Sequence, residues 1–407
     1  MDCTVMTLKN KELLVISPHF QKFQRSQIAS LSEGFAKSSV IVPQPWFPSA
    51  LLNLPLVEVH LAFLKNAKSH CGEYRTKHRS IPVYCPSYPA IPIPWVRNRM
   101  PLWAAESCKK IINKKQITFD LMHCHRLDYA YAGVLLKQER GFPLVVTCHG
   151  SDVYEFPRQN RFNYQIAQRI LRAVDFIIAV GSSDERELIS LGYPRSRIRL
   201  IPNGFDNRIF KPVDQESAKA EVGLQDKENV ILSVGSLLPI KGHIHLIRAI
   251  GHLLKQRSDF HLVLVGSGPL KSRLMQEVKK LRLGKYVSFI GSQPLTSIPS
   301  WMSASEFLVL PSNNEGFPTV IPEAFSCGKP VVSTNVGSVP DAVSDEDVGI
   351  LVPPANPKQL SIALNQALDT DWDSDIIIRK SRKYTLQRIS KSIISLYSQV
   401  LSEGRFG

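Results

Sequence analysis

Two glutamates, Glu315 and Glu323, are the residues of the segment NNEGFPTVIPEAFSCGKPVV (313–332) that could take part in chemistry. The segment follows an apolar run that is typical of a strand, and it opens a short helical pattern. Backbone N–H groups at such a helix start, assisted by the helix dipole, can face an anion such as a diphosphate. The amides expected to do so are those of Gly316, Phe317, Thr319 and Val320.

A carboxylate does not bind a diphosphate, so these two glutamates need another role. Carboxylates accept hydrogen bonds from hydroxyls and stabilise developing positive charge, and a sugar supplies both. Glu315 is therefore expected near the reacting carbon of a sugar, and Glu323 near a ribose. The alternative is that Glu315 only favours the helix start electrostatically and that Glu323 lies on a solvated helix face.

Lys241 and His149 are the next candidates. Lys241 follows the strand-like run of SVGSLLPIKG, where an ammonium can meet a phosphate. His149 ends the run PLVVTCHG and could stabilise a leaving phosphate or a sugar hydroxyl, while Gly150 beside it permits close backbone approach. An exposed loop lysine and a satisfied buried histidine remain the alternatives.

Other phosphate and nucleophile motifs fail. VGSGPLKSRL would need glycine where Lys271 stands to form a dinucleotide-binding fingerprint. Around CGKP, Glu323 and Pro330 occupy positions that a phosphate-binding loop fills with glycine and a hydroxyl residue, and no GxSxG occurs.

Short β-branched runs alternate with helical patterns along nearly the whole chain, which predicts parallel sheets buried on both faces. The first set is ELLVIS (12–17), SSVIVP (38–43), FDLMHCH (119–125), PLVVTCHG (143–150), DFIIAVG (175–181) and IRLIPNG (198–204). The second set is NVILSVG (229–235), FHLVLVG (260–266), YVSFIG (286–291), EFLVLPS (306–312), PVVST (330–334) and GILVPP (349–354).

This rhythm predicts an α/β chain with two doubly wound domains, at residues 1–205 and 206–385. A helix within 386–407 could pack back on the first domain. Open parallel sheets bind ligands at the carboxyl ends of their strands, so we expect the site in a cleft where the two domains face each other.

Composition limits the partners. The 407 residues include 50 Lys and Arg against 35 Asp and Glu, which favours anions such as lipid headgroups or phosphorylated small molecules. No zinc-finger, RNA-binding or basic-zipper pattern is present, so nucleic acid is not an expected partner. No segment approaches the ~20 apolar residues that span a bilayer, and the N-terminal segment lacks the plan of a secretory signal. We expect a cytoplasmic protein.

Seven scattered cysteines without a CxxC motif indicate reduced thiols rather than a disulfide framework. His123, Cys124 and His125 resemble a metal cluster, but adjacent strand residues point to opposite faces and no second pair has zinc-like spacing, so no metal is expected. Residues 44–105 are rich in proline and aromatic residues. Proline-rich loops packed on the domain are favoured there over membrane contact.

Seven motifs in order carry a family resemblance: HGSD (149–152), IPNGFD (201–206), VGSLLPIKG (234–242), LVGSGPL (264–270), FIGSQP (289–294), LPSNNEGFPTVIPEAFSCGKPVV (310–332) and GILVPP (349–354). They resemble those of family-4 retaining glycosyltransferases, especially members that build teichuronic acid and capsule polysaccharides. The resemblance covers roughly residues 119–400. It implies the GT-B fold, in which two Rossmann-like domains face each other across a cleft.

The resemblance implies a nucleotide-sugar donor, UDP- or GDP-linked, bound by the second domain, with no other cofactor and no metal. Glu315, His149 and Lys241 would act on the donor sugar and diphosphate, with His149 reaching across the cleft. The implied donor-binding residues are Glu323, Gly316, Phe317, Thr319, Val320, Ser236, Gly235, Ile290 and Gly291. Gly150 and Asp152 would lie on the acceptor side.

Three departures from the family pattern bear on the site. Ser236 stands where most relatives have an arginine that pairs with the diphosphate, so Lys241 is expected to carry more of the charge. SPHFQKFQRSQ lacks the relatives' glycine-rich first loop, which Lys22 or Arg25 could replace. Asp341 in GSVPD takes the place of a glutamate, which should affect fine geometry only.

The leading hypothesis is a retaining, metal-independent glycosyltransferase that extends a saccharide or polyprenyl-linked acceptor for a cell-surface polysaccharide or glycoconjugate. Its basic surface would favour the anionic inner face of the plasma membrane. A nucleotide-sugar 2-epimerase of the same architecture is the second hypothesis, and a catalytically weak nucleotide-sugar-binding protein is the third.

Overall fold

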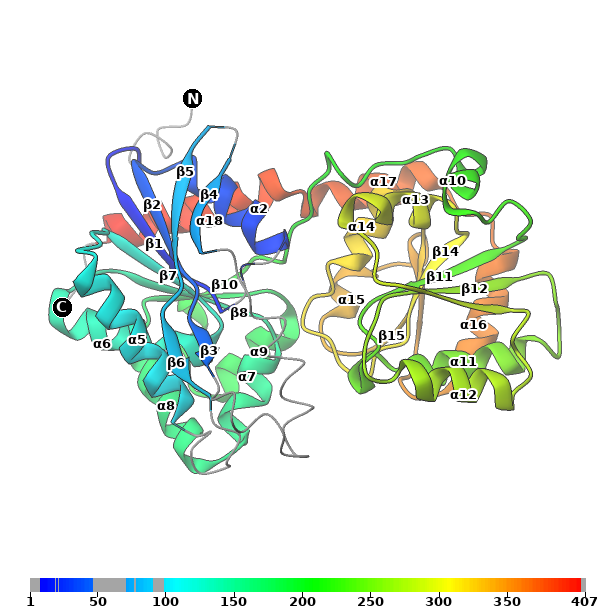
Figure 1. Cartoon of the computed structure of the whole chain (residues 1–407), viewed down its shortest axis with the longest axis horizontal. Helices are drawn as coiled ribbons and strands as arrows, with labels where there is room; N and C mark the ends of the chain where they lie inside the picture. Colours follow the sequence, from blue (N-terminus) through cyan, green and yellow to red (C-terminus); the bar gives the residue numbers. More distant parts are fainter. Residues whose placement is uncertain are drawn as a thin grey trace. The chain divides into compact units, whose positions relative to one another are not determined.

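The computed structural model describes residues 8–18, 20, 22–46, 71–76, 78–90 and 99–403, with the backbone alone at residues 22 and 23. The chain forms two compact units (Figure 1). Unit 1 comprises Met1–Pro202 and Gln387–Gly407, and unit 2 comprises Asn203–Leu386. The chain crosses between the units twice, and backbone hydrogen bonds link the two connecting segments to each other. The N–H of Phe205 donates to the carbonyl of Tyr384, and the N–H of Leu386 donates to the carbonyl of Phe205.

Unit 1 is built on an eight-stranded sheet of order β10-β9-β8-β7-β1-β2-β5-β4. All neighbours are parallel except the edge pair β4 and β5, which is antiparallel. Its strands are β1 (Glu12–Ile16), β2 (Lys37–Ile41), β4 (Gly72–Arg75), β5 (Ser80–Tyr84), β7 (Leu121–His125), β8 (Leu144–Cys148), β9 (Phe176–Ala179) and β10 (Ile198–Leu200). A separate parallel pair joins β3 (Gln44–Trp46) and β6 (Ser87–Pro89).

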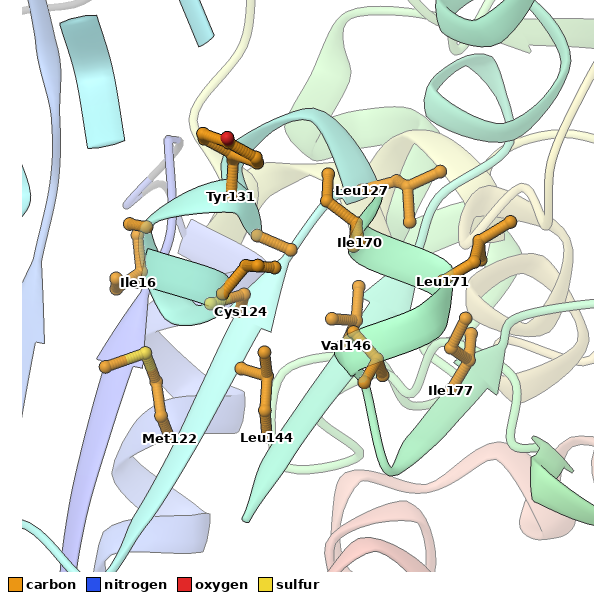
Figure 2. Close-up of a cluster of buried hydrophobic side chains, with 14 of the residues drawn as sticks. Ile16, Met122, Cys124, Leu127, Tyr131, Leu144, Val146, Ile170, Leu171 and Ile177 are labelled. Carbon is orange, nitrogen blue, oxygen red and sulfur yellow. The ribbon is translucent and has the colours of Figure 1, made fainter. Parts of the chain in front are cut away.

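Both faces of the central strands β1, β2, β7, β8 and β9 are buried, as their apolar runs predict. Cys124, Val146 and Ile177 point to one face, where Ile170 and Leu171 of a covering helix meet them (Figure 2). Among the described residues, the helices of unit 1 before its return segment are α2 (Lys22–Ser32), α5 (Met100–Lys114), α6 (Tyr131–Arg140), α8 (Arg161–Ala173) and α9 (Ser182–Ser190), with a single turn, α7 (Ser151–Tyr154), after β8.

The last helix of the chain, α18 (Leu386–Ser402), completes the other face of the unit 1 sheet. Its residues Ile393, Leu396 and Tyr397 are buried in the same cluster as Val15 and Val145 of the sheet. Its apolar residues recur at helical spacing and therefore form one stripe, which this face covers. This helix therefore belongs to unit 1.

Unit 2 is built on a fully parallel six-stranded sheet of order β13-β12-β11-β14-β15-β16. Its strands are β11 (Val230–Val234), β12 (His261–Val265), β13 (Val287–Gly291), β14 (Phe307–Leu310), β15 (Val331–Thr334) and β16 (Gly349–Val352). Its helices are α10 (Gln215–Val222), α11 (His243–Leu253), α12 (Lys271–Lys280), α13 (Ile298–Ser303), α14 (Val320–Ser326), α15 (Val339–Ala342), α16 (Pro357–Asp369) and α17 (Ser374–Ser381). Each unit is thus a mixed α/β, doubly wound parallel sheet.

One expectation about the cysteines is wrong. Cys71 and Cys85 form a disulfide, with Cα atoms 5.7 Å apart, at the edge of the unit 1 sheet. The antiparallel pairing of β4 with β5 brings these flanking residues together, and a separation of 14 residues in sequence does not reveal that pairing. Among the described residues, four other cysteines are free and buried: Cys108, Cys124, Cys148 and Cys327.

Residues 47–70 and 91–98, which hold much of the proline-rich segment, lie outside the described ranges. The expectation of loop packing or membrane contact there therefore stays a prediction. Among the helices that are described, none is long and apolar enough to cross a membrane.

Candidate active site

The centre of the unit 2 site is an ion pair between Lys241 and Glu315. Lys241 ends a short 3-10 turn after β11, and Glu315 lies in the loop after the neighbouring strand β14. The Lys241 Nζ lies 2.6 Å from Glu315 Oε1, and the Ser312 hydroxyl donates to the same oxygen at 2.6 Å. The side chain of Glu315 is only 9% exposed, whereas that of Lys241 is 26% exposed. The carboxylate is thus fixed, and the ammonium keeps access to solvent.

Two glycines allow the backbone to close around this pair. Gly337 has φ +54°, and a Cβ there would lie 1.7 Å from the carbonyl oxygen of Glu315. Gly242, directly after Lys241, has φ +64°, and a Cβ there would lie 2.0 Å from the carbonyl oxygen of Pro311. Any other residue at either position would push apart the loops that carry Lys241 and Glu315.

The loop after Glu315 leads into α14, which spans Val320–Ser326 with Thr319 as its first flanking residue. Gly316 accepts a backbone hydrogen bond from Ser338, and Gly316, Thr319 and Val320 are partly exposed. Phe317 is buried, with its ring 5.3 Å from that of Tyr384. Phe317 is therefore a packing anchor for the loop.

Glu323 lies in the first turn of α14. Burial raises the pKa of its carboxyl to about 8 from an ordinary value of 4.5. Within the described part of the chain no countercharge offsets this burial, so the carboxyl favours its neutral form, which can donate as well as accept a hydrogen bond. This differs from the solvated helix face that was the alternative for Glu323.

The remaining predicted donor residues lie at the ends of β11 and β13. Ser236 is exposed just after β11, and its carbonyl accepts from Leu238. Gly235 lies so close to the next loop that a Cβ on Gly266 would be 1.9 Å from its carbonyl oxygen. Ile290 and Gly291 close β13, where a register shift disturbs the pairing with β12. All of these positions are at the carboxyl edge of one parallel sheet.

In unit 1, His149, Gly150 and Asp152 follow β8. Gly150 has φ +95°, which favours glycine. Asp152 is fully buried, and its two oxygens accept from the N–H of His149 at 2.8 Å and of Leu127 at 2.7 Å. Asp152 therefore ties the loops after β7 and β8 together and is not itself exposed to a ligand.

The histidines of β7 share a face of the sheet because residues two apart in a strand point the same way. His123 donates to or accepts from Thr147 Oγ1 at 2.8 Å and Tyr397 Oη at 2.5 Å, and His125 Nδ1 lies 3.1 Å from His149 Nε2. Cys124 points to the opposite core. Within the described residues no three His, Cys, Asp or Glu side chains gather as metal ligands.

Sequence reasoning missed four contributors. Ser312 and Gly337 fix Glu315, and His125 contacts His149. Arg126, with φ +76°, donates to the two oxygens of Asp128 from Nε and Nη2 and to the Ser151 hydroxyl from Nη1. Only His125 left a signal in the sequence, since its spacing of two from His123 predicts a shared face.

The structure also gives the positions of Arg25 and Asp341, which belong to the other two departures from the family pattern. Arg25 folds back onto Phe20: its Nε donates to the Phe20 carbonyl at 2.7 Å, and its guanidinium lies 5.2 Å from the ring centre. The side chain of Lys22 lies outside the described residues. Asp341 lies in the single turn α15, and its carbonyl accepts from the Tyr384 hydroxyl at 3.1 Å.

Comparison with known proteins agrees with this arrangement. A solved structure of Anabaena Alr3699/HepE in complex with UDP superposes with a TM-score of 0.72 at 20% identity, covering 95% of this chain and 100% of that one. The same Anabaena protein in complex with UDP-glucose gives a TM-score of 0.70 at 19% identity, covering 96% and 100%. This likeness shows the fold, which is GT-B.

Among sequence relatives, the D-inositol 3-phosphate glycosyltransferase of Acidothermus cellulolyticus is 29% identical over 70% of this chain and 68% of its own length. The putative teichuronic acid biosynthesis glycosyltransferase TuaC of Bacillus subtilis is 28% identical over 84% of each chain. Residues 56–208 match the model of "Glycosyltransferase Family 4", and residues 214–384 match that of "Glycosyl transferases group 1". Since these two models take up both units in turn, the chain belongs to the family-4 glycosyltransferases.

Proposed function

We propose that this glycosyltransferase moves a sugar from a nucleotide-diphosphate sugar, UDP- or GDP-linked, to a saccharide or polyprenyl-linked acceptor, with retention at the anomeric carbon. Cell-surface polysaccharide or glycoconjugate biosynthesis is the proposed setting. The teichuronic acid relative and the UDP and UDP-glucose complexes of the GT-B structure support this choice.

The observation that carries the proposal is the ion pair of Lys241 with Glu315. A fixed carboxylate beside a partly exposed ammonium provides, at one point, an acceptor for sugar hydroxyls and a cation for a leaving diphosphate. Because Ser312 also donates to Glu315, the carboxylate keeps a partner when the ammonium turns toward a phosphate.

In this scheme unit 2 binds the donor and unit 1 binds the acceptor. Glu323 takes the ribose hydroxyls, and the backbone after Glu315 lies along the diphosphate. Lys241 supplies the positive charge in place of a metal, so activity is expected to persist in excess EDTA. His149 is the proposed contact of unit 1 with the donor sugar.

An assay of nucleoside diphosphate release separates this function from its alternatives. Purified protein is incubated with UDP- and GDP-sugars, with and without saccharide or polyprenyl-linked acceptors. A transferase releases nucleotide in an acceptor-dependent way, a 2-epimerase converts the nucleotide sugar without acceptor, and a binding protein does neither. Turnover without acceptor, or none at all, would overturn the proposal.

Thermal stabilisation by UDP, GDP, ADP and NAD then identifies the donor nucleotide. A ligand at about 100 times its dissociation constant adds roughly 2.7 kcal/mol to the free energy of unfolding. We expect one of the diphosphates to stabilise the wild type and to lose this effect in Lys241→Met and Glu323→Ala, while the exposed control Lys279→Met keeps it. Stabilisation by NAD alone would contradict the donor assignment.

A second proposal concerns location. The formal net charge of +15 favours an anionic membrane surface, where a lipid-linked acceptor would be found. Cosedimentation with vesicles should be stronger for anionic than for neutral lipid and should fall as salt is raised. Equal binding to both vesicle types would reject this proposal.

A further inference from the structure

A column of polar groups runs along the face of β7 and β8 that α18 covers. Tyr397 of α18 reaches His123 Nδ1 at 2.5 Å, and Thr147 reaches His123 Nε2 at 2.8 Å. The ring centres of His123 and His125 lie 4.5 Å apart, and those of His125 and His149 lie 5.4 Å apart with their planes at an angle of 15°. The column therefore ends at the residue proposed to contact the donor sugar.

The inner members of the column are neutral. His123 and His125 are at most 1% exposed. Burial lowers the pKa of His123 well below its ordinary value, and burial together with His149 lowers the pKa of His125 to about 3. Each of these two rings therefore carries one proton at neutral pH, on one of its two nitrogens.

The surroundings of His125 decide which nitrogen holds that proton. Its Nε2 is buried and has no hydrogen-bond partner among the residues that the structure describes, while its Nδ1 lies 3.1 Å from His149 Nε2. A buried N–H without an acceptor is rarer in proteins than a buried acceptor without a donor. The proton of His125 is therefore assigned to Nδ1, from which it is donated to His149 Nε2.

We propose that His125 is a positioning residue that holds His149 in one ring orientation and in the tautomer with its proton on Nδ1. Because Nε2 of His149 accepts from His125, the Nδ1–H of His149 becomes its donor group. Such a donor suits a sugar hydroxyl or a leaving-group oxygen. This catalytic consequence rests on the proposed function, whereas the tautomer does not.

The tautomer is measured directly by nitrogen NMR of the full-length protein carrying 15N-labelled histidine. The His149 signals are identified by their loss in His149→Gln. We expect wild-type His149 to show a pyrrole-like Nδ1 and a pyridine-like Nε2. The opposite pattern, or averaged shifts from two exchanging tautomers, would overturn the proposal without any variant of His125.

Two substitutions of His125 test its role. His125→Asn keeps a donor near the Nδ1 position and should preserve the His149 pattern, whereas His125→Leu should give averaged shifts. If the leucine variant does not fold, the wild-type spectrum still tests the tautomer of His149, and the asparagine variant still tests whether a donor at position 125 preserves it. An unchanged His149 pattern in folded His125→Leu would remove His125 from this role.

The consequence for turnover is tested with a double-mutant cycle. His125→Leu should lower kcat by about 10- to 100-fold with little change in the KM for donor, and His125→Asn should recover most of it. In a His149→Gln background, His125→Leu should have no further effect, since it acts through His149. Additive losses would show that His125 acts by another route. A protein with the expected tautomer but no transferase activity would reject the proposed function alone.

Discussion

The two units hold their polar residues in opposite ways. In unit 2, Lys241 and Glu315 form a partly exposed ion pair that one hydroxyl and two close glycine contacts fix in place. In unit 1, His125 is neutral and buried, and Asp152 is a buried carboxylate whose partners are backbone amides.

This difference follows from the ligand each unit is proposed to bind. A diphosphate requires positive charge that can leave its resting partner, so the unit 2 pair must keep contact with solvent. A neutral sugar hydroxyl requires direction rather than charge, which buried rings and amides supply. We therefore expect a charge change in the Lys241–Glu315 pair to reduce activity more than stability, and a change at the buried Asp152 to reduce stability more than activity.

The largest effect is expected for Glu315→Gln. The amide keeps the shape of the side chain but loses the charge that pairs with Lys241, so kcat should fall by about 10³-fold while the melting temperature changes little. Steady-state assays and thermal unfolding measure the two. Glu346→Gln, at an exposed position of the same unit, is the control and should behave as wild type. If Glu315→Gln kept wild-type activity, the charge of the Lys241–Glu315 pair would not be needed for turnover, and the contrast between the two units would be wrong.

Glu323 should make the stability of unit 2 depend on pH. Its pKa is raised from 4.5 unfolded to about 8 folded, so the folded state binds the extra proton between these values. The stabilisation from this group is complete below pH 4.5 and is lost as pH rises toward 8. The loss in the free energy of unfolding is on the order of 3 kcal/mol. This is less than the full pKa shift implies, because the side chain is only partly buried and solvent weakens the effect. Glu323→Gln cannot titrate.

The measurement is the difference in melting temperature between wild type and Glu323→Gln at several pH values from 5 to 9. The wild type should lose stability relative to the variant as pH rises. A constant difference across this range would show that the carboxyl titrates at its ordinary pKa.

Asp152→Asn should test the buried carboxylate of unit 1. An amide can accept from only one of the two N–H groups, and its own NH₂ then faces the other, so we expect a loss of about 2 kcal/mol in the free energy of unfolding. Chemical denaturation followed by hydrogen exchange at Leu127 and His149 locates the loss. Glu155→Gln, exposed in the same region, is the matched control. A stable Asp152→Asn would show that the loops do not depend on this carboxylate.

Tyr397→Phe should give the smallest effect. It removes the hydroxyl that bonds His123 and leaves the ring packed beside Phe35, at a cost of about 1 kcal/mol. Denaturation of Tyr164→Phe, whose side chain is 47% exposed, provides the reference and should match wild type. An equal effect of the two substitutions would mean that the bond to His123 adds nothing to the docking of α18.

Much of the fold was predictable because buried parallel strands appear as uninterrupted apolar runs. The runs that predict strands lie over β1, β2 and β7–β16 of the structure, and GT-B with its family is confirmed. The edge of the unit 1 sheet was not predictable, because β4 and β5 are exposed in part and lie in a proline-rich segment. The disulfide of Cys71 with Cys85 was missed for the same reason.

For the site, the sequence by itself determined the residue types and their order. These are local patterns, which neighbouring residues in the sequence are enough to reveal: Glu315 before a helix start, Lys241 after a strand and His149 at a strand end. Only the tertiary structure decided that Lys241 pairs with Glu315, that Phe317 is an anchor, and that His125 lies on His149. These are contacts between neighbouring strands and loops, whose register is set by packing across the whole sheet rather than by any one segment.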